Sequence, residues 1–566
     1  MAPTAAWWRH ASVYQVYVRS FSDANGDGVG DLAGITSRLD FIASLGVDAI
    51  WLNPCFPSPQ RDHGYDVSDY FSIEPDYGDL ETFDAFIAGA HLHGIKVLLD
   101  VVPNHCSTDH QWFRDAVRAG AGSPERARFW FRPGRGPDGA APPNNWKAIF
   151  GGSAWTRVIE SDGNPGEWYL GVFTPFQPDW NFDDPTVVDH FDRMLRFWFD
   201  RGVDGFRADA VIYLGKVEGL PDADEADVDS QLNPMYTYVP SQHHVWRRWR
   251  TLVDTYERDH NTELLLVAEA FSPDRPDLML DYANPTEFHQ AFAFDLMLSA
   301  WRADRLRHVV TSTLDALRPS GLLPAWTLNN HDTQRSSTRY ARSDAVEQGG
   351  FHDGAFHISD APIDAELGER RARAAAALML ALPGCVYLFA GEELGLPEVL
   401  DLPSEARQDP VFANSGRAQL GRDGCRVPLP WQADPRGSYG FSPPDTVAVP
   451  WLPQPSGWGA WSAEVQQQDP ASTLSLYRLA GRLRRSLSGL RSDHFEWIAG
   501  LSEDVLAFRR GSVTVLCNPT AHTFTVPEDI IGPTMLMLSS VASHTAIDTI
   551  APNCTVWLAT TIGAAI

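Results

Sequence analysis

Arg207 and Asp209 stand two residues apart in the segment 205–209, whose apolar composition is typical of a buried strand. Side chains at positions i and i+2 of a strand point to the same face, so we expect the arginine and the aspartate to lie together. A neighbouring positive charge favours the ionised form of a carboxyl group, which predicts an anionic Asp209 at neutral pH. An oriented carboxylate of this kind could act as the nucleophile in a double displacement at a glycosidic bond. A structural ion pair at the end of a strand is the alternative.

Other polar side chains follow three more apolar segments, each where a strand is expected to end. In a barrel of parallel strands the carboxyl ends gather at one face, so these side chains would converge with Arg207 and Asp209. Four carboxylates, two histidines and an arginine from four strands exceed what strand capping requires, and we therefore predict an active site. The additional residues are Asp100, Asn104 and His105 after one strand, Glu269 after another, and His331 and Asp332 after a third.

Glu269 lies in the apolar run 264–271 with no cation beside it in the sequence. Removal from water should raise its pKa and keep it protonated, as a general acid requires. If it faces an ionised Asp209 at about 5–5.5 Å, the reaction would proceed with retention through a covalent intermediate. The third carboxylate, Asp332, could bind sugar hydroxyls and stabilise positive charge on the ring.

The elements that position these residues alternate between strand and helix. Short, nearly continuous apolar runs indicate strands covered on both faces, and helical periodicity recurs between them. This order predicts an α/β fold with right-handed parallel crossovers, a (β/α)8 TIM barrel. The predicted strands lie at 13–21, 48–52, 96–102, around 205–209, 264–269, 292–298, 326–330 and 386–390, and the clearest helices at 35–42, 80–91, 185–200, 245–256 and 474–487.

Two insertions and a C-terminal change of pattern divide the chain. Residues 104–180 are rich in Pro, Gly, Trp and Phe and too long for a plain loop, so we predict an inserted subdomain after the third strand. A second, acidic insertion follows the fourth strand at about 213–241. The barrel then comprises 1–103 and 181–488. Short alternating segments in 489–566 predict a small C-terminal all-β domain, a β-sandwich.

The composition limits the partners. A formal net charge of −28 argues against nucleic acid and anionic membrane surfaces. No apolar run approaches the ~18 residues of a membrane span, and residues 1–10 lack the apolar core of a leader, so a cytoplasmic location is expected. Six scattered cysteines without a CxxC pair predict buried thiols in a reducing compartment rather than disulfides. The pattern does not fix the oligomeric state.

An oxygen-rich turn follows the first predicted strand. Oxygen-bearing side chains recur at every second position and Gly28 permits a sharp turn, a pattern similar to the first half of a calcium loop. We predict a structural Ca²⁺ site, with Mg²⁺ as the second choice, far from the reacting groups; a solvated acidic turn is the alternative. The expected ligands are Asp23, Asn25, Asp27, Val29 and Asp31. No organic cofactor is expected.

Together these motifs resemble the α-amylase superfamily, glycoside hydrolase family 13. The matching segments are Asp100-Val-Val-Pro-Asn-His105, Gly205-Phe-Arg-Ala-Asp209, Val267-Ala-Glu269 and Asn330-His-Asp332. Segments 62–66, 177–181 and 421–428 resemble the branch of α-glucosidases and oligo-1,6-glucosidases, with Trp180 where that branch usually has Leu. The resemblance implies Asp209 as nucleophile, Glu269 as acid/base and Asp332 as transition-state stabiliser. It also implies a glucose subsite lined by Tyr65, His105, Arg207 and His331.

The branch resemblance also implies the size of the substrate. In these enzymes an aspartate after the second strand pairs with an arginine after the eighth, and the pair closes the pocket around a terminal glucose. Asp62 matches the aspartate, and either Arg422 or Arg426 matches the arginine. Exo-action on short α-glucosides is therefore expected. The neighbouring wall would be shaped by Phe173, Gln177 and Phe150, or these residues would instead form the core of the inserted subdomain.

The residue after the nucleophile often separates 1,6 from 1,4 preference in this branch, with Val for the first and Thr for the second. Ala210 fits neither, so linkage, chain length and aglycone stay open.

Three functions follow. The leading hypothesis is a retaining, exo-acting α-glucosidase that releases terminal α-linked glucose from short oligosaccharides or small α-glucosides and also transfers glucose to other hydroxyl groups. The second is an α-glucosyltransferase or isomerase of the trehalose synthase or sucrose isomerase type, which differs in how well water is excluded. The third is a non-catalytic relative acting as an interaction module, like the heavy chain of amino-acid transporters; such proteins lose the carboxylates and gain a membrane helix.

Overall fold

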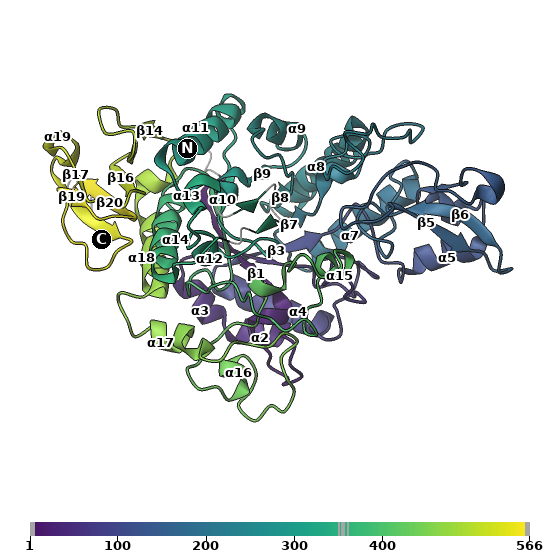
Figure 1. Cartoon of the computed structure of the whole chain (residues 1–566), viewed down its shortest axis with the longest axis horizontal. Helices are drawn as coiled ribbons and strands as arrows, with labels where there is room; N and C mark the ends of the chain where they lie inside the picture. Colours follow the sequence, from purple (N-terminus) through teal and green to yellow (C-terminus); the bar gives the residue numbers. More distant parts are fainter. Residues whose placement is uncertain (1–5, 349–350, 353–356, 359–360, 561–566) are drawn as a thin grey trace.

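The computed structural model describes residues 6–348, 351–352, 357–358 and 361–560. Within them, eight parallel strands close into a barrel in the order β1-β2-β3-β7-β8-β9-β10-β13 (Figure 1), as the (β/α)8 prediction requires. The strands are β1 (Ser12–Val16), β2 (Ala49–Leu52), β3 (Lys96–Val101), β7 (Gly205–Ala208), β8 (Leu265–Ala268), β9 (Gln290–Ala293), β10 (Ala325–Thr327) and β13 (Cys385–Phe389).

Alternation along the strands separates two layers of the core. In β3, Leu98 belongs to the apolar cluster inside the barrel, whereas Leu99 belongs to the cluster between barrel and helices. Asp100 has the same parity as Leu98 and therefore points inward at the carboxyl end of the strand. Its register partner on β7 is Arg207. The periodicity that fills the barrel with apolar side chains thus also brings these two charges together.

Helices cover the outside of the barrel. Their bounds follow local signals: α7 begins at Pro185, and Asp184 caps it by accepting a hydrogen bond from the Thr186 amide at 2.8 Å. The covering helices include α2 (Leu32–Ser37), α3 (Leu39–Ser44), α4 (Leu80–Leu92), α7 (Pro185–Asp200), α8 (His243–His260), α11 (Ala303–Leu317), α14 (Ala365–Met379) and α18 (Thr473–Ser486).

Three predicted elements change their type or are interrupted in the structure. The strand predicted at 13–21 ends at Val16, and α1 (Val18–Phe21) follows it. The strand predicted at 292–298 divides into β9 and α10 (Asp295–Leu298), and the helix predicted at 35–42 breaks at Arg38. Apolar side chains continue past these strand ends because the following turns are also buried, and periodicity alone does not separate a short buried strand from a buried helical turn.

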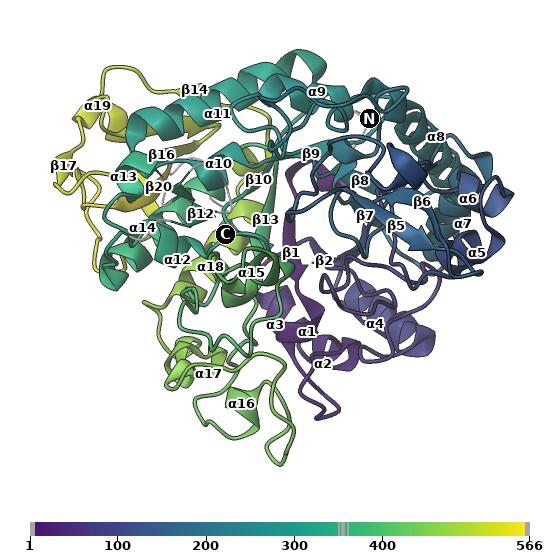
Figure 2. The ribbon, with the colours of Figure 1, turned by 45° about the vertical axis from the view of Figure 1, so that its right-hand side comes forward.

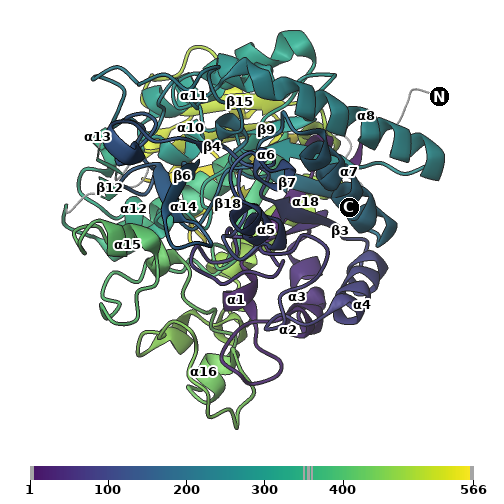
Figure 3. The same ribbon diagram turned by 90° about the vertical axis from the view of Figure 1, so that its right-hand side faces the viewer.

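Residues 104–180 contain a three-stranded antiparallel sheet of their own, in the order β4-β6-β5. Figure 3 shows this sheet in front of the barrel, with the C-terminal strands behind. Its strands are β4 (Phe131–Arg132), β5 (Trp155–Ile159) and β6 (Pro165–Leu170), and α5 (Gln111–Ala119) and α6 (Pro124–Ala127) precede them.

The C-terminal strands lie on the opposite side of the molecule (Figure 2). A five-stranded sheet, β14-β15-β16-β20-β18, and a two-stranded sheet, β17-β19, share one apolar cluster. Trp557 Nε1 donates to the Ala377 carbonyl at 2.9 Å, which joins β20 to α14. The strands are β14 (Glu496–Trp497), β15 (Leu506–Arg510), β16 (Val513–Asn518), β17 (Phe524–Thr525), β18 (Thr534–Ser539), β19 (Thr549–Ile550) and β20 (Cys554–Thr560).

The structure also bears on the expectations about membrane spans and cysteines. No helix in the described ranges is both long and apolar enough to cross a bilayer. All six cysteines are buried and free, as the absence of a CxxC pair indicated.

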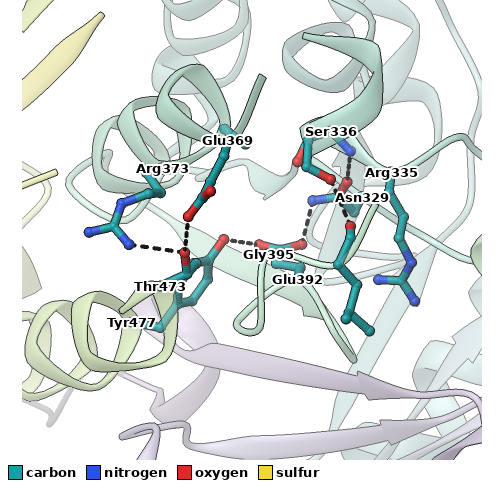
Figure 4. Close-up of a pocket in the computed structure, with 12 residues that line it drawn as sticks. Asn329, Arg335, Ser336, Glu369, Arg373, Glu392, Gly395, Thr473 and Tyr477 are labelled. Carbon is teal, nitrogen blue, oxygen red and sulfur yellow. Dashed lines mark hydrogen bonds between the residues drawn. The ribbon is translucent and has the colours of Figure 1, made fainter. Parts of the chain in front are cut away.

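Glu392, buried in the loop after β13, joins two distant parts of the fold (Figure 4). It accepts hydrogen bonds from Asn329 Nδ2 at 2.7 Å and from the Tyr477 hydroxyl of α18 at 2.9 Å. Asn329 in turn accepts from the Ser336 amide at 2.6 Å, so both ends of the loop that carries His331 and Asp332 are held. Removal from water outweighs these hydrogen bonds and raises the pKa of Glu392 to about 7.

We predict that Glu392→Gln is better tolerated at pH 8 than at pH 5. The folded-state pKa lies above the unfolded value, so the contribution of Glu392 to stability is fully present below about pH 4 and is lost as pH rises through 7. A glutamine can keep both contacts, with its oxygen accepting from Asn329 and its Nε2 donating to the Tyr477 hydroxyl, and it does not ionise. Thermal unfolding at both pH values measures the difference, with Glu366→Gln in the exposed first turn of α14 as the control. The same change in Tm at both pH values for Glu392→Gln would contradict this account.

Candidate active site

Arg207 is the centre of the cluster at the carboxyl end of the barrel. Its Nη1 lies 2.8 Å from Asp100 Oδ1 and 2.5 Å from Asp209 Oδ1, and its Nη2 lies 2.9 Å from Glu269 Oε2. The side chain is 2% exposed. The expected contact between Arg207 and Asp209 is therefore present, but one guanidinium serves three carboxyl groups from three strands.

This sharing bears on two predictions about ionisation: the pKa of Glu269 is raised as expected, although a cation contacts it, whereas that of Asp209 is not lowered. Glu269 was expected to have no neighbouring cation, yet Arg207 contacts it, because parallel pairing of β7 and β8 brings together groups that are distant in sequence. Asp209 was expected to have a lowered pKa. Burial, with repulsion from Glu269 and Asp100, instead outweighs Arg207 and raises the pKa of Asp209 above its usual range. Burial also raises the pKa of Glu269, and that of Asp100 to about 7.

Three carboxyl groups around a single cation titrate as one unit, and the unit retains protons at pH values where isolated carboxyl groups are ionised. The site therefore holds a proton that is available for transfer. In the absence of substrate this proton belongs to the three carboxyl groups together rather than to one of them.

The Asp209 and Glu269 carboxyl groups lie within hydrogen-bonding distance of each other. The backbone sets this approach: Ala210 has a left-handed conformation with φ of +49°, and its amide donates to Glu269 Oε2 at 2.8 Å. This separation is shorter than the ~5–5.5 Å expected of a retaining pair and much shorter than the ~6.5–9.5 Å that lets an inverting pair hold a water between its carboxyl groups. Of the two geometries open to paired carboxylates, this one suits direct attack and retention rather than inversion.

Asp332, unlike Asp209 and Glu269, has two arginines beside its carboxyl group. Its Oδ1 lies 3.0 Å from both Arg422 Nη1 and Arg426 Nη2, and its Oδ2 lies 3.2 Å from His331 Nε2. Burial opposes ionisation of Asp332, but His331 and the two arginines outweigh it and hold the pKa of this carboxyl below its usual range. Asp332 is therefore an anion in the site.

Apart from Asp332, the two arginines left open by the sequence have different partners. Arg422 Nη2 lies 2.8 Å from Asp62 Oδ1, so Arg422 closes the wall with Asp62. Arg426 instead donates through Nε to the His331 carbonyl at 2.7 Å. Asp409, which the sequence did not single out, orients Arg422 by accepting from its Nε at 2.6 Å. An Asp-Pro pair at a helix start could have indicated that Asp409 caps α15 (Pro410–Asn414), but not that it contacts Arg422.

Two buried histidines complete the wall, and burial lowers the pKa of both. The Tyr65 hydroxyl lies 3.0 Å from Asp100 Oδ2 and 2.5 Å from His331 Nε2, and Gln15 Nε2 donates to His331 Nδ1 at 2.8 Å. His105 has its pKa lowered to about 3 by burial, and its Nε2 lies 3.0 Å from Gln177 Nε2.

These groups surround a cavity of about 880 Å³, within the range of small-molecule sites. Arg207, Arg426 and Gln177 support the wall from behind, and Gln177 Nε2 donates to Asp62 Oδ2 at 2.9 Å. The cavity continues beyond Glu269 along an apolar wall that the sequence did not indicate, because its side chains come from the loop after β8 and from the short α10 with the residue before it, which have no distinctive pattern. The predicted residues that line the cavity are Asp62, Tyr65, His105, Phe150, Phe173, Asp209, Ala210, Glu269, His331, Asp332 and Arg422; the apolar wall comprises Phe271, Phe294, Met297 and Leu298.

The family model of the alpha amylase catalytic domain matches residues 15–493. The chain belongs to the alpha-amylase family. An alpha-glucosidase of Culex pipiens is 35% identical over 84% of this chain and 75% of its own length, and a probable alpha-glucosidase of Rhizobium meliloti is 35% identical over 91% and 90%. The crystal structure of the alpha-glucosyl transfer enzyme XgtA superposes with a TM-score of 0.82 at 32% identity, covering 98% of this chain and all of that one.

The oxygen-rich turn of this alpha-amylase family member is shaped by Gly28. Its φ is +91°, and a Cβ there would lie 2.2 Å from the Val449 carbonyl oxygen. Asp23 accepts from the amides of Gly26 and Gly28 at 2.6 and 2.9 Å, and Asp31 from Ala24 at 2.9 Å. No group of three or more His, Cys, Asp and Glu side chains in the described chain is placed to hold a metal. The all-oxygen donor set nevertheless suits Ca²⁺, which stays a prediction.

We predict that Ca²⁺ raises Tm by a few degrees and that a chelator reverses the effect, because an ion that binds the folded state stabilises it. Asp27→Ala should remove the response without changing kcat, because this turn lies apart from the cavity. Thermal unfolding with and without Ca²⁺ is the measurement, and Asp434→Ala, an exposed carboxylate elsewhere, is the control. An equal Ca²⁺ response in the Asp27→Ala variant would show that the cation binds somewhere else.

Arg422→Ala should lower kcat/KM for short α-glucosides at least about 30-fold, mainly by raising KM. The variant leaves Asp62 and Asp409 without their shared cation, and losing one partner of a buried charge pair costs about 2 kcal/mol or more. Steady-state kinetics measure the change, and Arg436→Ala, which removes an exposed pair with Asp434, is the control. A native KM in Arg422→Ala would mean that the closing pair does not contact the sugar.

Proposed function

We propose that this chain is a retaining, exo-acting α-glucosidase that releases terminal glucose from small α-glucosides or short oligosaccharides. The observation that carries the proposal is the contact between the Asp209 and Glu269 carboxyl groups, both held by Arg207, at the floor of a cavity closed by Asp62 and Arg422. The names of the alpha-glucosidase relatives support the same activity.

The chemistry divides into two steps. In the first, Asp209 attacks C1 of the bound glucose and forms an ester, while the proton held by the carboxyl cluster passes from Glu269 to the departing oxygen. In the second, Glu269 takes a proton from water, and the resulting hydroxide attacks C1 and releases Asp209. Asp332, anionic in the site, would hold sugar hydroxyls and stabilise the oxocarbenium-like charge in both steps.

The closing pair accounts for exo-action. Asp62 and Arg422 block one side of the cavity at 2.8 Å, so only the end of a glucan chain would reach Asp209. The aglycone would occupy the part of the cavity beside the apolar wall of Phe271, Phe294, Met297 and Leu298, next to the acid that protonates its oxygen.

Transfer of glucose is the second candidate. XgtA, a structure of the same fold at 32% identity, is described as an alpha-glucosyl transfer enzyme. The same three carboxylates serve hydrolysis and transfer, and the outcome depends on whether water or another hydroxyl reaches the glucosyl-enzyme. The apolar wall beside Glu269 disfavours ordered water on that side, which supports some transfer. We also propose a reducing, cytoplasmic location on the ground of the six free cysteines.

We predict that the protein releases glucose from maltose, sucrose or trehalose and that the first product is the α-anomer. Retention follows from two displacements at C1. Proton NMR during the first minutes distinguishes the anomers, and chromatography separates glucose from new disaccharides. The β-anomer as first product would contradict retention, and new disaccharides without net glucose would assign the chain to the transferases.

The matched variant is Asp209→Ala, which should lower kcat at least about 10³-fold while the fold persists, because the nucleophile lies at an open polar cavity. Added azide should restore turnover by occupying the vacated space. A near-native rate without azide would contradict the assignment of the nucleophile.

A further inference from the structure

Lys216 is a completely buried cation just behind the wall of the cavity. Its Nζ lies 2.9 Å from Asp179 Oδ2, 2.6 Å from the Tyr213 carbonyl, and 3.4 Å from both Asn104 Oδ1 and the Leu214 carbonyl. Lys216 is one of three lysines among 45 Lys and Arg residues, so arginine serves nearly everywhere else as the cation of this chain.

The partners of Lys216 belong to three separate segments. Asn104 follows β3, Asp179 belongs to the inserted subdomain, and Tyr213 ends the short 3-10 helix Val211–Tyr213 that follows Asp209 and Ala210. Asp179 adds a further connection, since its Oδ1 accepts from Asn104 Nδ2 at 3.3 Å and from the Val172 amide at 3.1 Å. A single ammonium group thus joins the β3 end, the subdomain and the β7 end.

Neighbours of these partners form one side of the sugar pocket. His105 directly follows Asn104, and Gln177 lies two residues before Asp179 and bonds to Asp62. The Phe173 ring lies 4.8 Å from the His105 ring and 5.2 Å from the Tyr213 ring, measured between centroids. Displacing any of the three segments would therefore move a side chain that faces the glucose.

We propose that Lys216 is a positioning residue that holds the β3 end, the inserted subdomain and the β7 end in the arrangement that binds glucose, and that an arginine cannot replace it. An ammonium is compact and presents its three N–H bonds to oxygen atoms on different sides. A guanidinium is larger and planar, so it cannot meet the same oxygen atoms within a fully buried space.

The alternative is an ion pair that only contributes to folding. Buried ion pairs contribute little net stability in many proteins, whereas removal of one partner leaves an unpaired charge and is destabilising. A loss of stability in a Lys216 variant fits both explanations. A change in substrate binding with the chemical step largely kept fits only the positioning role.

The test is K216M, assayed with p-nitrophenyl α-D-glucopyranoside and by thermal unfolding. We expect KM to rise about tenfold or more, since small displacements of binding groups have effects of this size. We expect a smaller change in kcat, because the catalytic carboxyl groups are held separately by Arg207, Arg422 and Arg426. K216R should resemble K216M. Glucose should raise Tm less in both variants than in the wild type, and this shift in Tm measures binding independently of turnover.

Lys96→Met is the matched control. Lys96 also pairs with an aspartate, its Nζ lying 2.8 Å from Asp204 Oδ1, but it lies at the amino end of β3, away from the cavity. We expect a native KM for this control, whatever its stability. A milder variant, D179N, keeps the size and polarity of its side chain and should raise KM in the same direction as K216M, so the proposal stays testable if K216M does not fold.

The inference rests on the proposed α-glucosidase activity, and the two can fail separately. A wild-type protein that binds glucose but does not hydrolyse α-glucosides contradicts the proposed function alone. An active wild type together with a native KM in K216M and D179N, even at lowered Tm, contradicts the positioning role. A fully native K216R contradicts the requirement for lysine.

Discussion

The single guanidinium of Arg207 contacts Asp100, Asp209 and Glu269, and the chemistry of the site depends on this excess of carboxyl groups over cations. With a cation for each carboxylate, every group would ionise and no acid would remain. With no cation, burial would keep all three neutral and leave no nucleophile. One guanidinium among three carboxyl groups provides both a proton and a negative charge within a few ångströms. The register of β3, β7 and β8 fixes that ratio. Asp100 pairs with Arg207, and Arg207 pairs with Val267, two residues before Glu269.

On the other side of the cavity, Asp332 is contacted by two guanidinium groups instead of sharing one. Asp332 is held between Arg422 and Arg426 and stays anionic, while the arginines also contact Asp62 and the His331 backbone. The site therefore has one carboxyl group that does not change its protonation state and a cluster that does. This division separates binding and charge stabilisation from proton transfer. It comes from the number of guanidinium groups near each carboxylate rather than from differences in exposure.

Sequence patterns predicted what depends on local periodicity and on recognisable motifs. The barrel and the convergence of polar strand ends follow from apolar runs and their spacing, and the Arg207–Asp209 contact follows from the two-residue repeat of a strand. The cation beside Glu269 could not be predicted, because it lies on the adjacent strand and no single segment encodes how neighbouring strands align. The choice between Arg422 and Arg426, and the parts played by Asp409 and Lys216, depend on loops whose paths are set by distant packing.

The closing pair of the pocket has a further consequence. Asp62 and Arg422 are 360 residues apart, and the barrel itself closes only when β13 pairs with β1. During synthesis, the first strands leave the ribosome long before their last neighbour exists, and the free edge of β1 is available to other chains until then. A nascent chain therefore acquires its nucleophile and its acid early but cannot enclose a sugar until most of the polypeptide has been translated. A chain terminated after Glu269 but before Arg422 would contain both reacting groups but lack the arginine that closes the pocket.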